Sequence, residues 1–469
     1  MNKKPIVYVD LDGTLSPSDV LLESCLLLLK SGFYWIFMMV WWALHGGWRL
    51  KTEVAARVDP LLDHLPLNQS LLARLRQFKA EGHEIVLASA SLSRDVNKVA
   101  RRVGLFDRVL ASESVNLKGH RKLEAIQADS KGTPFIYFGD SAADVPVWKA
   151  ANRAYAVNAS MLTRRRAAAA GITLGSLDGN QGMRLRVWFK AMRMQQWAKN
   201  ALLFLPLIAA HKTDAGLWLQ MLWGFVAFGL VASATYIWND LMDLNADRQH
   251  PRKCLRPMAS GLIGIQQALL GMVVLAVSGF ALSWILVGPA FTLVLAVYTL
   301  ATLLYTFVFK RTAFVDVLLL AMLYTLRVIA GGVATGIEVS SWLLAISLFV
   351  FLSLALVKRC AELEFLQAAG QTSARGRGYE TSDLSYLVSM GISSGFLAVL
   401  VLALYADSQN GSLLYSNPKL LWGICPVLLY WLMRVWILTS RQQMVDDPVH
   451  FALTDRTSWL CLGLITLVA

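Results

Sequence analysis

The sequence has few cysteines, little charge and no apolar leader, and each shortage excludes a class of protein. Only 16% of the 469 residues are charged and 56% are hydrophobic, with a mean hydropathy of +0.50. Such a chain is too long for one domain and too apolar for a soluble protein, so part of it must be membrane. The five cysteines lack the paired spacing of a disulfide framework or a zinc site. They are Cys25, Cys254, Cys360, Cys425 and Cys461.

The amino-terminal nine residues contain two lysines and a short apolar run. A signal peptide has a longer apolar region, so we expect the first domain to stay in the cytoplasm. The net charge of +13 would suit nucleic acid only with a basic face on a soluble module. Here the basic residues cluster at the ends of apolar segments, which is the membrane pattern. We therefore expect membrane lipid, and no nucleic acid, as a partner.

Four polar side chains between two very apolar segments indicate a metal site. On a helix of about 100° per residue, Asn239, Asp240, Asp243 and Asp247 share an arc of roughly a quarter turn. This face repels itself unless it holds a cation, and its oxygen ligands suit Mg²⁺ bridging to a diphosphate. The alternative is a solvated loop between helices. Position favours a site, because acids next to membrane segments are usually functional.

This stretch resembles the Asn-Asp-x-x-Asp-x-x-x-Asp motif of the UbiA superfamily of intramembrane prenyltransferases, and the motif is complete. Residues 239–261 look most like the branch that transfers phosphoribose to a polyprenyl phosphate, and the resemblance extends from about Arg184 to the end. It implies catalytic roles for Asp240 and Asp243, Mg²⁺ on these two and Asp247, and substrate contacts from Asn239 and Arg256.

Three predicted strands of the amino-terminal region each end in a polar cluster. Residues 6–9, 84–88 and 135–138 are short apolar runs. Because α/β proteins build their sites where parallel strands end, we expect an α/β Rossmann-like domain with these clusters at one edge. The clusters are Asp10 with Asp12, Ser89 with Ser91, and Asp140 with Asp144; Lys118 stands alone in a later loop.

These clusters, in this order, resemble the haloacid dehalogenase phosphohydrolase family over about residues 1–160. The resemblance implies that Asp10 is a nucleophile that forms an aspartyl-phosphate and that Asp12 is the general acid/base. It also implies phosphoryl contacts from Ser89 and Lys118. Mg²⁺ would lie on Asp10, Asp140 and Asp144, with Asp12 counted in the same metal set. The alternative is a degenerate domain kept as a scaffold.

We expect the phosphatase-like domain to span residues 1–175, with a helical cap at about 16–80, a linker at 176–184 and the membrane domain at 185–469. The insertion at 20–49 is too short and interrupted for a confident span. It either docks on the membrane or the second domain, or forms a buried helical hairpin. The basic residues Arg164, Arg165 and Arg166 suit anionic headgroups.

About nine apolar segments predict a polytopic helical membrane bundle. The positive-inside rule places their basic loops, and so the amino end, in the cytoplasm. We expect this multi-pass bundle to lie in a bacterial-type inner membrane. The segments are 185–210, 217–238, 265–285, 288–308, 312–335, 341–357, 384–405, 417–438 and 456–469.

Further polar residues in the membrane region are candidate substrate contacts. Asp316 and Arg327 share a helix face that must point into the bundle, for structural pairing or for substrate. Lys199 could contact substrate or merely snorkel. Arg375 and Arg377 are possible phosphate partners. The candidate substrate contacts of the membrane region are Lys199, Asn200, Lys310, Arg327, Lys358, Arg359, Glu362 and Tyr379.

The region after residue 356 departs from the aromatic-acceptor prenyltransferases, which carry a second aspartate-rich motif there. Here Lys358 and Arg359 precede two glutamates, and such a basic site suits substrates with more phosphate. The Lys-Arg-x-Ala-Glu-Leu pattern of residues 358–363 also looks like the phosphoribosyltransferase branch. This resemblance implies Mg-dependent transfer of 5-phosphoribose from phosphoribosyl diphosphate to a polyprenyl phosphate, and the fused phosphatase-like domain suggests dephosphorylation of the lipid product. The alternatives are prenyl transfer to an aromatic acceptor and a non-catalytic lipid-binding scaffold.

Overall fold

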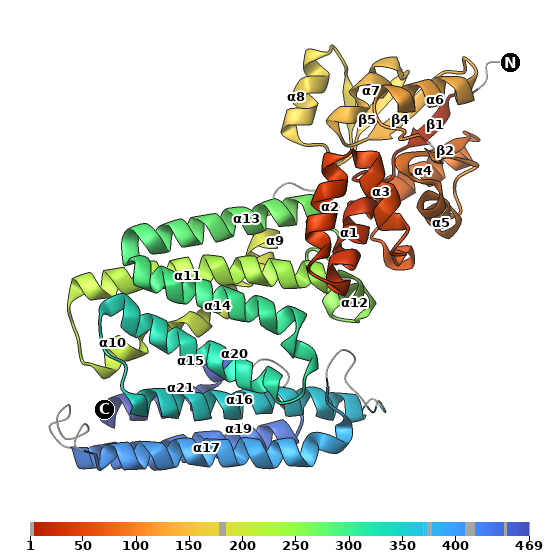
Figure 1. Cartoon of the computed structure of the whole chain (residues 1–469). Coiled ribbons are helices and arrows are strands. Elements are labelled where there is room, and N and C mark those ends of the chain that lie inside the picture. The colour runs from red at the N-terminus through yellow and green to blue at the C-terminus, as the bar shows by residue number, and fades with distance from the viewer. Residues whose placement is uncertain are drawn as a thin grey trace. The chain divides into compact units, whose positions relative to one another are not determined.

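The computed structural model describes residues 4–113, 115–177, 184–368, 370, 372, 378–408, 418–444 and 448–468 (Figure 1). Arg375, Arg377 and most of the predicted linker lie outside these residues. The chain forms two compact units that do not follow a single boundary in the sequence. The first combines Met1–Met192 with Tyr236–Met272, and the second combines Arg193–Thr235 with Val273–Ala469.

The first unit contains a six-stranded parallel sheet in the order β3-β2-β1-β4-β5-β6. β1 is buried along its whole length, as expected for a central strand covered on both faces. Its neighbours β2 and β4 come from distant parts of the chain, so three separate loops meet where these strands end. The strands are β1 (Ile6–Val9), β2 (Ile85–Leu92), β3 (Arg108–Ser112), β4 (Phe135–Gly139), β5 (Arg153–Ala156) and β6 (Leu174–Ser176).

Helices cover both faces of this sheet, and a separate hydrophobic cluster fills each side. α4 (Gln69–Ala80) packs Leu71, Leu75 and Phe78 against the sheet, because its apolar residues recur at helical spacing. The remaining helices of this layer are α5 (Ser93–Val103), α6 (His120–Ser130), α7 (Val145–Ala150) and α8 (Met161–Ala169), with 3₁₀ turns η1 (Leu62–His64) and η2 (Ala142–Asp144).

The insertion after β1 forms three short helices, α1 (Val20–Ser31), α2 (Trp35–Leu44) and α3 (Gly47–Ala55). Leu28, Trp42 and Val54 form its small core. These three helices occupy residues 20–55 of the cap expected at about 16–80. α4 belongs to the sheet because its apolar face completes the sheet's core.

The segment 236–272 joins this unit through the end of α11 (Ala215–Met242), α12 (Leu244–Gln249), the 3₁₀ turn η5 (Lys253–Leu255) and the start of α13 (Ile265–Leu282). The helix is interrupted at Asp243, which caps α12 in a non-helical conformation. The one uninterrupted helix expected from residue 239 to 247 is therefore replaced by two helices.

Seven helical segments of the described chain are long and apolar enough to cross a membrane, so this is a multi-pass membrane protein. The prediction of about nine spans is not confirmed. They are Ala215–Met242, Ile265–Val287, Pro289–Phe307, Val315–Thr335, Ser341–Ala368, Thr381–Ala406 and Leu420–Ser440. Within them lie α14 (Pro289–Phe307), α15 (Val315–Thr335), α16 (Ser341–Ala368), α17 (Leu384–Ala406), α19 (Ile424–Ser440), η6 (Ser283–Val287) and the 3₁₀ turn η8 (Thr381–Asp383).

The two other expected spans, 185–210 and 456–469, do not form helices long enough to cross a membrane, each for a local reason. Residues 185–210 divide into α9 (Arg184–Ala191), the 3₁₀ segment η4 (Met194–Phe204) and α10 (Leu205–Ala209), because Arg193 adopts a left-handed conformation. α21 (Arg456–Val468) has 13 residues, fewer than the roughly 20 that a crossing needs. In Figure 1, α16, α17 and α19 lie side by side and contact one another. The other short elements are η7 (Phe309–Arg311), η9 (Pro418–Gly423) and α20 (Pro448–Thr454).

Candidate functional site

Three carboxylates meet at the ends of β1 and β4. Asp10 directly follows β1, and Asp140 and Asp144 follow β4, its parallel neighbour. One oxygen of each lies within 4.8 Å of the others. Among the described residues of the chain, this is the one group of three or more potential ligands found at such spacing. The sequence prediction brought these three residues together, and the structure does the same.

Lys122 occupies the centre of this cluster, although the sequence prediction chose Lys118. The Lys122 Nζ lies 2.9 Å from Asp10 Oδ1 and 3.5 Å from Asp144 Oδ1, and it donates to the Tyr137 hydroxyl at 3.1 Å. Lys122 is buried, whereas Lys118 is exposed in the preceding loop. The available signal was the helix that starts at His120, because its first turn carries Lys122 toward the sheet edge.

Asp12 lies beside the cluster but outside it, so its place in the metal set is corrected. Its Oδ2 accepts from the Ser91 hydroxyl at 2.5 Å and, more weakly, from Ser89 at 3.4 Å. Its Oδ1 accepts from the Val20 backbone N–H at 2.9 Å. These bonds orient the carboxyl at the start of α1, a position suited to proton transfer. Ser89 is buried and also accepts from the Ser91 backbone N–H.

Burial and mutual repulsion raise the pKa of two of these carboxyl groups, Asp10 and Asp140. Burial, with repulsion from Asp144 and Asp12, raises the pKa of Asp10 to about 7, although Lys122 opposes the shift. Burial and repulsion from Asp10 and Asp144 raise the pKa of Asp140 to about 8. A hard divalent cation would relieve this repulsion with oxygen ligands, so the three residues fit Mg²⁺.

The loop after β1 has room for this cluster only with glycine at position 13. Gly13 has φ +77°, and a Cβ there would stand 2.1 Å from Asp140 Oδ2. Any other residue would be strained and would displace the carboxylate. The Asp-Gly turn, weak as a signal by itself, is therefore required by the third carboxylate of the site.

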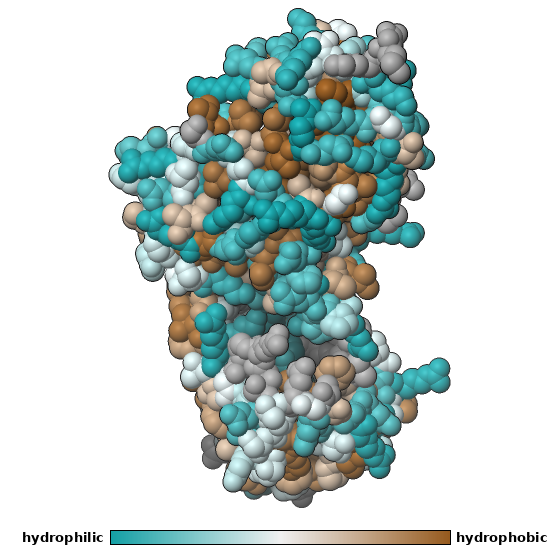
Figure 2. Space-filling view, turned by 90° about the vertical axis from the view of Figure 1, so that its right-hand side faces the viewer, coloured by the Kyte–Doolittle hydropathy of each residue, from teal (hydrophilic) through white to brown (hydrophobic). Residues whose placement is uncertain are grey.

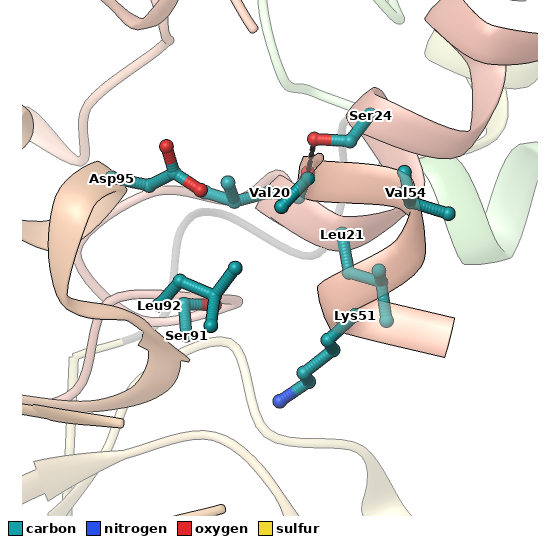
Figure 3. A pocket seen from close by; sticks show the side chains of 9 residues that line it. Val20, Leu21, Ser24, Lys51, Val54, Ser91, Leu92 and Asp95 are labelled. Atoms are coloured by element: carbon teal, nitrogen blue, oxygen red, sulfur yellow. Dashed lines mark hydrogen bonds between the residues drawn. The ribbon is translucent and has the colours of Figure 1, made fainter. Parts of the chain in front are cut away.

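A small pocket opens beside Asp12, between the insertion and the sheet (Figure 3). Lys51 reaches into it and is held by the Ala90 carbonyl at 2.8 Å and Asn116 Oδ1 at 3.2 Å. The pocket thus combines apolar and polar lining residues, with a lysine next to the proposed acid/base. Its lining residues are Val20, Leu21, Ser24, Lys51, Val54, Ala55, Ser91, Leu92 and Asp95.

The acidic motif, which begins in the last turn of α11 and continues into α12, is arranged around an arginine. Arg256 Nη1 lies 3.1 Å from Asp240 Oδ1 and 2.6 Å from Asp247 Oδ2, and both aspartates are buried. Asp243 lies 3.7 Å from Lys30, and Asn239 lies half-buried at the end of α11. Asp240 and Asp247 offer buried carboxylate oxygens, the ligands that Mg²⁺ prefers.

Three predicted substrate contacts meet inside the second unit. Arg327 is buried, and its Nε donates to Asn200 Oδ1 at 3.2 Å while Nη2 donates to the Tyr298 hydroxyl at 2.9 Å. Lys199 stands 5.5 Å from the centre of the Tyr324 ring, over which Arg327 also lies. Asn200 Nδ2 is buried without a protein acceptor among the described residues. Tyr298 was not predicted, since its helix shows no polar pattern.

A second buried group in this unit collects Arg359, Glu362 and Tyr379 around Asp316. Arg359 Nη2 donates to Asp316 Oδ2 at 2.6 Å, and the Tyr379 hydroxyl donates to Asp316 Oδ1 at 2.6 Å. Arg359 also pairs with Glu362. Asp316 is therefore paired with Arg359 and Tyr379, whereas the sequence analysis expected Arg359 to contact substrate phosphate.

The two remaining candidates of this unit lie nearer the surface. Lys358, the neighbour of Arg359, is exposed, and Lys310 is half-buried in η7. Helix geometry explains the contrast at 358 and 359, because consecutive residues lie about 100° apart around the axis. The two basic residues predicted to act together therefore have different environments.

Comparison with known proteins agrees with both regions. The model of the "UbiA prenyltransferase family" matches residues 201–454, and that of the "haloacid dehalogenase-like hydrolase" matches residues 7–149. An uncharacterized protein y4nM of Sinorhizobium fredii is 35% identical over 99% of this chain and 90% of its own length. A decaprenyl-phosphate phosphoribosyltransferase of Mycobacterium tuberculosis is 37% identical over 57% of this chain and 87% of its own.

Among solved structures, a UbiA homolog from Archaeoglobus fulgidus bound to GPP and Mg²⁺ covers 60% of this chain and 99% of that chain. Its sequence identity is 16% and its TM-score 0.47. Fold and sites together define a multi-pass membrane enzyme with an amino-terminal hydrolase-like domain. The chain belongs to the UbiA prenyltransferase family and carries a haloacid dehalogenase-like domain at its amino end.

Proposed function

We propose that the membrane domain transfers 5-phosphoribose from phosphoribosyl diphosphate to a polyprenyl phosphate. The observation that carries this proposal is the pair of buried aspartates, Asp240 and Asp247, around the half-buried Arg256 near the end of a membrane span. The relatives named decaprenyl-phosphate phosphoribosyltransferase, 37% identical over 272 residues, support the choice of donor and acceptor. Membership of the UbiA family supports transfer to or from a prenyl lipid.

In this reaction a phosphate oxygen of the lipid attacks the anomeric carbon of the ribose. A new carbon–oxygen bond forms, and the bond to the diphosphate breaks, so inorganic diphosphate leaves. Mg²⁺ held near Asp240 and Asp247 would neutralise charge on this leaving group. Arg256 lies between the two acids and would supply a hydrogen-bonded positive charge to a phosphate oxygen.

We propose further that the amino-terminal domain removes the 5-phosphate from the lipid product. Asp10 would attack the phosphorus, and Asp12 would protonate the departing ribose oxygen. Burial, with repulsion from Asp19, raises the pKa of Asp12 to about 6, which keeps part of it protonated near neutral pH. Asp12 would then take a proton from the water that hydrolyses the aspartyl-phosphate, and phosphate would leave.

Lys122 would hold the transferred phosphoryl group beside Asp10. Although burial alone lowers the pKa of Lys122, the charges of Asp10 and Asp144 raise it above its usual range, so the ammonium stays charged. Mg²⁺ on Asp10, Asp140 and Asp144 would neutralise the phosphoryl oxygens. Lys51, in the pocket beside Asp12, would contact the remainder of the substrate.

The decisive experiment compares the wild-type protein with Asp10→Asn, using phosphoribosyl diphosphate, polyprenyl phosphate and Mg²⁺. Wild type should release phosphate only when both transfer substrates are present. The variant should accumulate a lipid heavier by one phosphate, identified by mass spectrometry. Equal accumulation in both proteins would refute the dephosphorylation step, and consumption of prenyl diphosphate with an aromatic acceptor would refute the donor.

A further inference from the structure

The second helix of the insertion exposes an apolar and aromatic surface. Trp42 is buried against Leu28 and Val54, but most of the other large side chains around α2 are open. A soluble domain seldom leaves such a surface uncovered. On the face shown in Figure 2, by contrast, the α/β region at the top carries many hydrophilic side chains. The residues of this surface, each 43–81% exposed, are Phe33, Tyr34, Phe37, Val40, Trp41 and Leu44.

A contact within the first unit ties this surface to the end of a membrane span. Lys30, in the last turn of α1, donates from Nζ to the Met242 carbonyl at 3.1 Å and lies 3.7 Å from Asp243 Oδ1. Met242 is the last residue of α11. Trp35, where α2 begins, follows Lys30 by five residues, a reach of at most about 18 Å. α2 therefore starts close to the end of a span.

The length of that span sets the depth of its end. α11 has 28 residues and is therefore about 42 Å long, which exceeds the hydrocarbon thickness of roughly 30 Å. Its end thus reaches the headgroup level, where Trp and Tyr side chains are favoured. With ten residues, α2 is too short to cross the bilayer but suits a position in the plane of its surface.

The charged residues that flank α2 also favour a position at the membrane surface. No Asp, Glu, Lys or Arg occurs between Lys30 and Arg49, a stretch with one histidine, His45, and these two basic residues flank the exposed surface. The Arg49 guanidinium lies 4.5 Å from the centre of the Trp41 ring, so charge and aromatic surface are adjacent. Basic residues beside an apolar helix favour anionic lipid headgroups.

We propose that α2 lies in the lipid interface, with its aromatic side chains among the upper acyl chains and Lys30 and Arg49 at the headgroups. The expected depth is about 5–10 Å below the headgroup boundary. α1 and α3, which flank α2, line the pocket beside Asp12. Lipid contact would then hold that pocket at the membrane surface, where a lipid-linked phosphate ester could enter it; this consequence, unlike the contact, rests on the proposed function.

The test uses the full chain in vesicles of equal parts phosphatidylcholine and phosphatidylglycerol. Cys25 and Cys254 are replaced by serine, and a single Phe37→Cys site is labelled with an environment-sensitive fluorophore. Nitroxide groups on the lipid acyl chains then report contact by quenching. The matched control is Gln127→Cys, an exposed position on α6 of the same unit.

We expect several-fold stronger lipid quenching at position 37 than at position 127, together with a blue-shifted emission. Emission typical of water at position 37 would overturn the proposal. Shielding from water without lipid quenching would overturn it as well, because the cover would then be protein, such as a second copy. Catalysis does not enter this measurement, so its result is independent of the phosphatase and transferase assays.

Discussion

Glu23 and Arg248, 225 residues apart, form a buried bidentate ion pair with nitrogen–oxygen distances of 2.8 and 2.9 Å. Glu23 lies on α1 of the insertion and also accepts from the Ser18 hydroxyl. Arg248 lies on α12 and donates from Nε to the Ala259 carbonyl. Because Arg248 follows Asp247 in the acidic motif, this pair connects the hydrolase-like domain to a candidate residue of the transferase site.

Glu23→Gln should destabilise the first unit, because it leaves the Arg248 charge buried without its partner. We expect the free energy of unfolding to fall by about 3 kcal/mol. The melting temperature of the purified protein should be lower as a result. Transfer activity should fall as well, since Arg248 helps to position Asp247. The matched control is Glu53→Gln, which breaks an exposed pair with Arg57 and should cost less than about 1 kcal/mol.

A double variant with Arg248→Gln shows whether the two effects are coupled. We expect it to lose much less stability than the sum of the two single variants, because no unpaired charge remains. Strictly additive losses would contradict the ion pair, and transfer at the wild-type rate in Glu23→Gln would contradict its link to the acidic motif.

Lys122→Met should reduce phosphate release by roughly a hundredfold or more, the usual effect of removing a group that stabilises charge in the transition state. Lys118→Met, the matched control four residues earlier, should change it little because Lys118 is exposed. Both are measured as kcat/KM with a phosphate ester substrate. A larger effect at Lys118 would restore the original prediction from the sequence.

In a chelator, the stability of the first unit should fall as the pH rises. The folded pKa values of Asp10 and Asp140, about 7 and about 8, exceed the ordinary 3.8. The folded protein therefore keeps protons that the unfolded chain has lost. This stabilisation is fully present below about pH 4 and disappears as the pH passes through 7 and 8.

Melting temperatures at about pH 5 and about pH 9 measure this dependence. Asp140→Asn should flatten it, because the amide does not titrate. Mg²⁺ should raise the melting temperature most at the higher pH, where the carboxylates are charged. A melting temperature that rises with pH in the chelator would contradict the raised pKa values of Asp10 and Asp140.

Lys358→Ala and Arg359→Ala should fail in different ways. If the exposed Lys358 contacts the donor's 5-phosphate, its loss should weaken donor affinity by roughly ten- to a hundredfold and leave the fold intact. Arg359→Ala leaves Asp316 buried without its cation, so we expect a loss of about 3–5 kcal/mol in stability. Donor titrations and melting curves separate the two. Normal stability in Arg359→Ala would contradict the structural role.

The structure places the residues that directly follow strands where the sequence predicted them. Asp10, Asp140 and Asp144 each follow a strand that is recognisable from its apolar run, and parallel pairing brings strand ends together. Lys122 was missed because it lies on a helix, where its rotation toward the sheet depends on packing. Asp12 was counted in the metal set, whereas in the structure it lies beside the cluster and accepts from the Ser91 hydroxyl.

In the membrane region the sequence determined hydrophobic segments and the acidic motif, since both follow from local patterns of residues. It could not determine that Arg193 divides the first apolar segment, because a left-handed residue has no distinct signal there. The sequence did not reveal the partners of buried charged side chains either. Arg359 was expected to meet phosphate and pairs with Asp316, 43 residues away.

By itself, then, the sequence determined the two domain types and most of the carboxylates, because apolar periodicity and short motifs depend on neighbours in the chain. The tertiary structure alone decided which charge meets which: Lys122 with Asp10, Arg256 with Asp240 and Asp247, and Glu23 with Arg248. A buried charge needs an oppositely charged partner, and the sequence offers several candidates for each one. Only the packing of distant segments selects one.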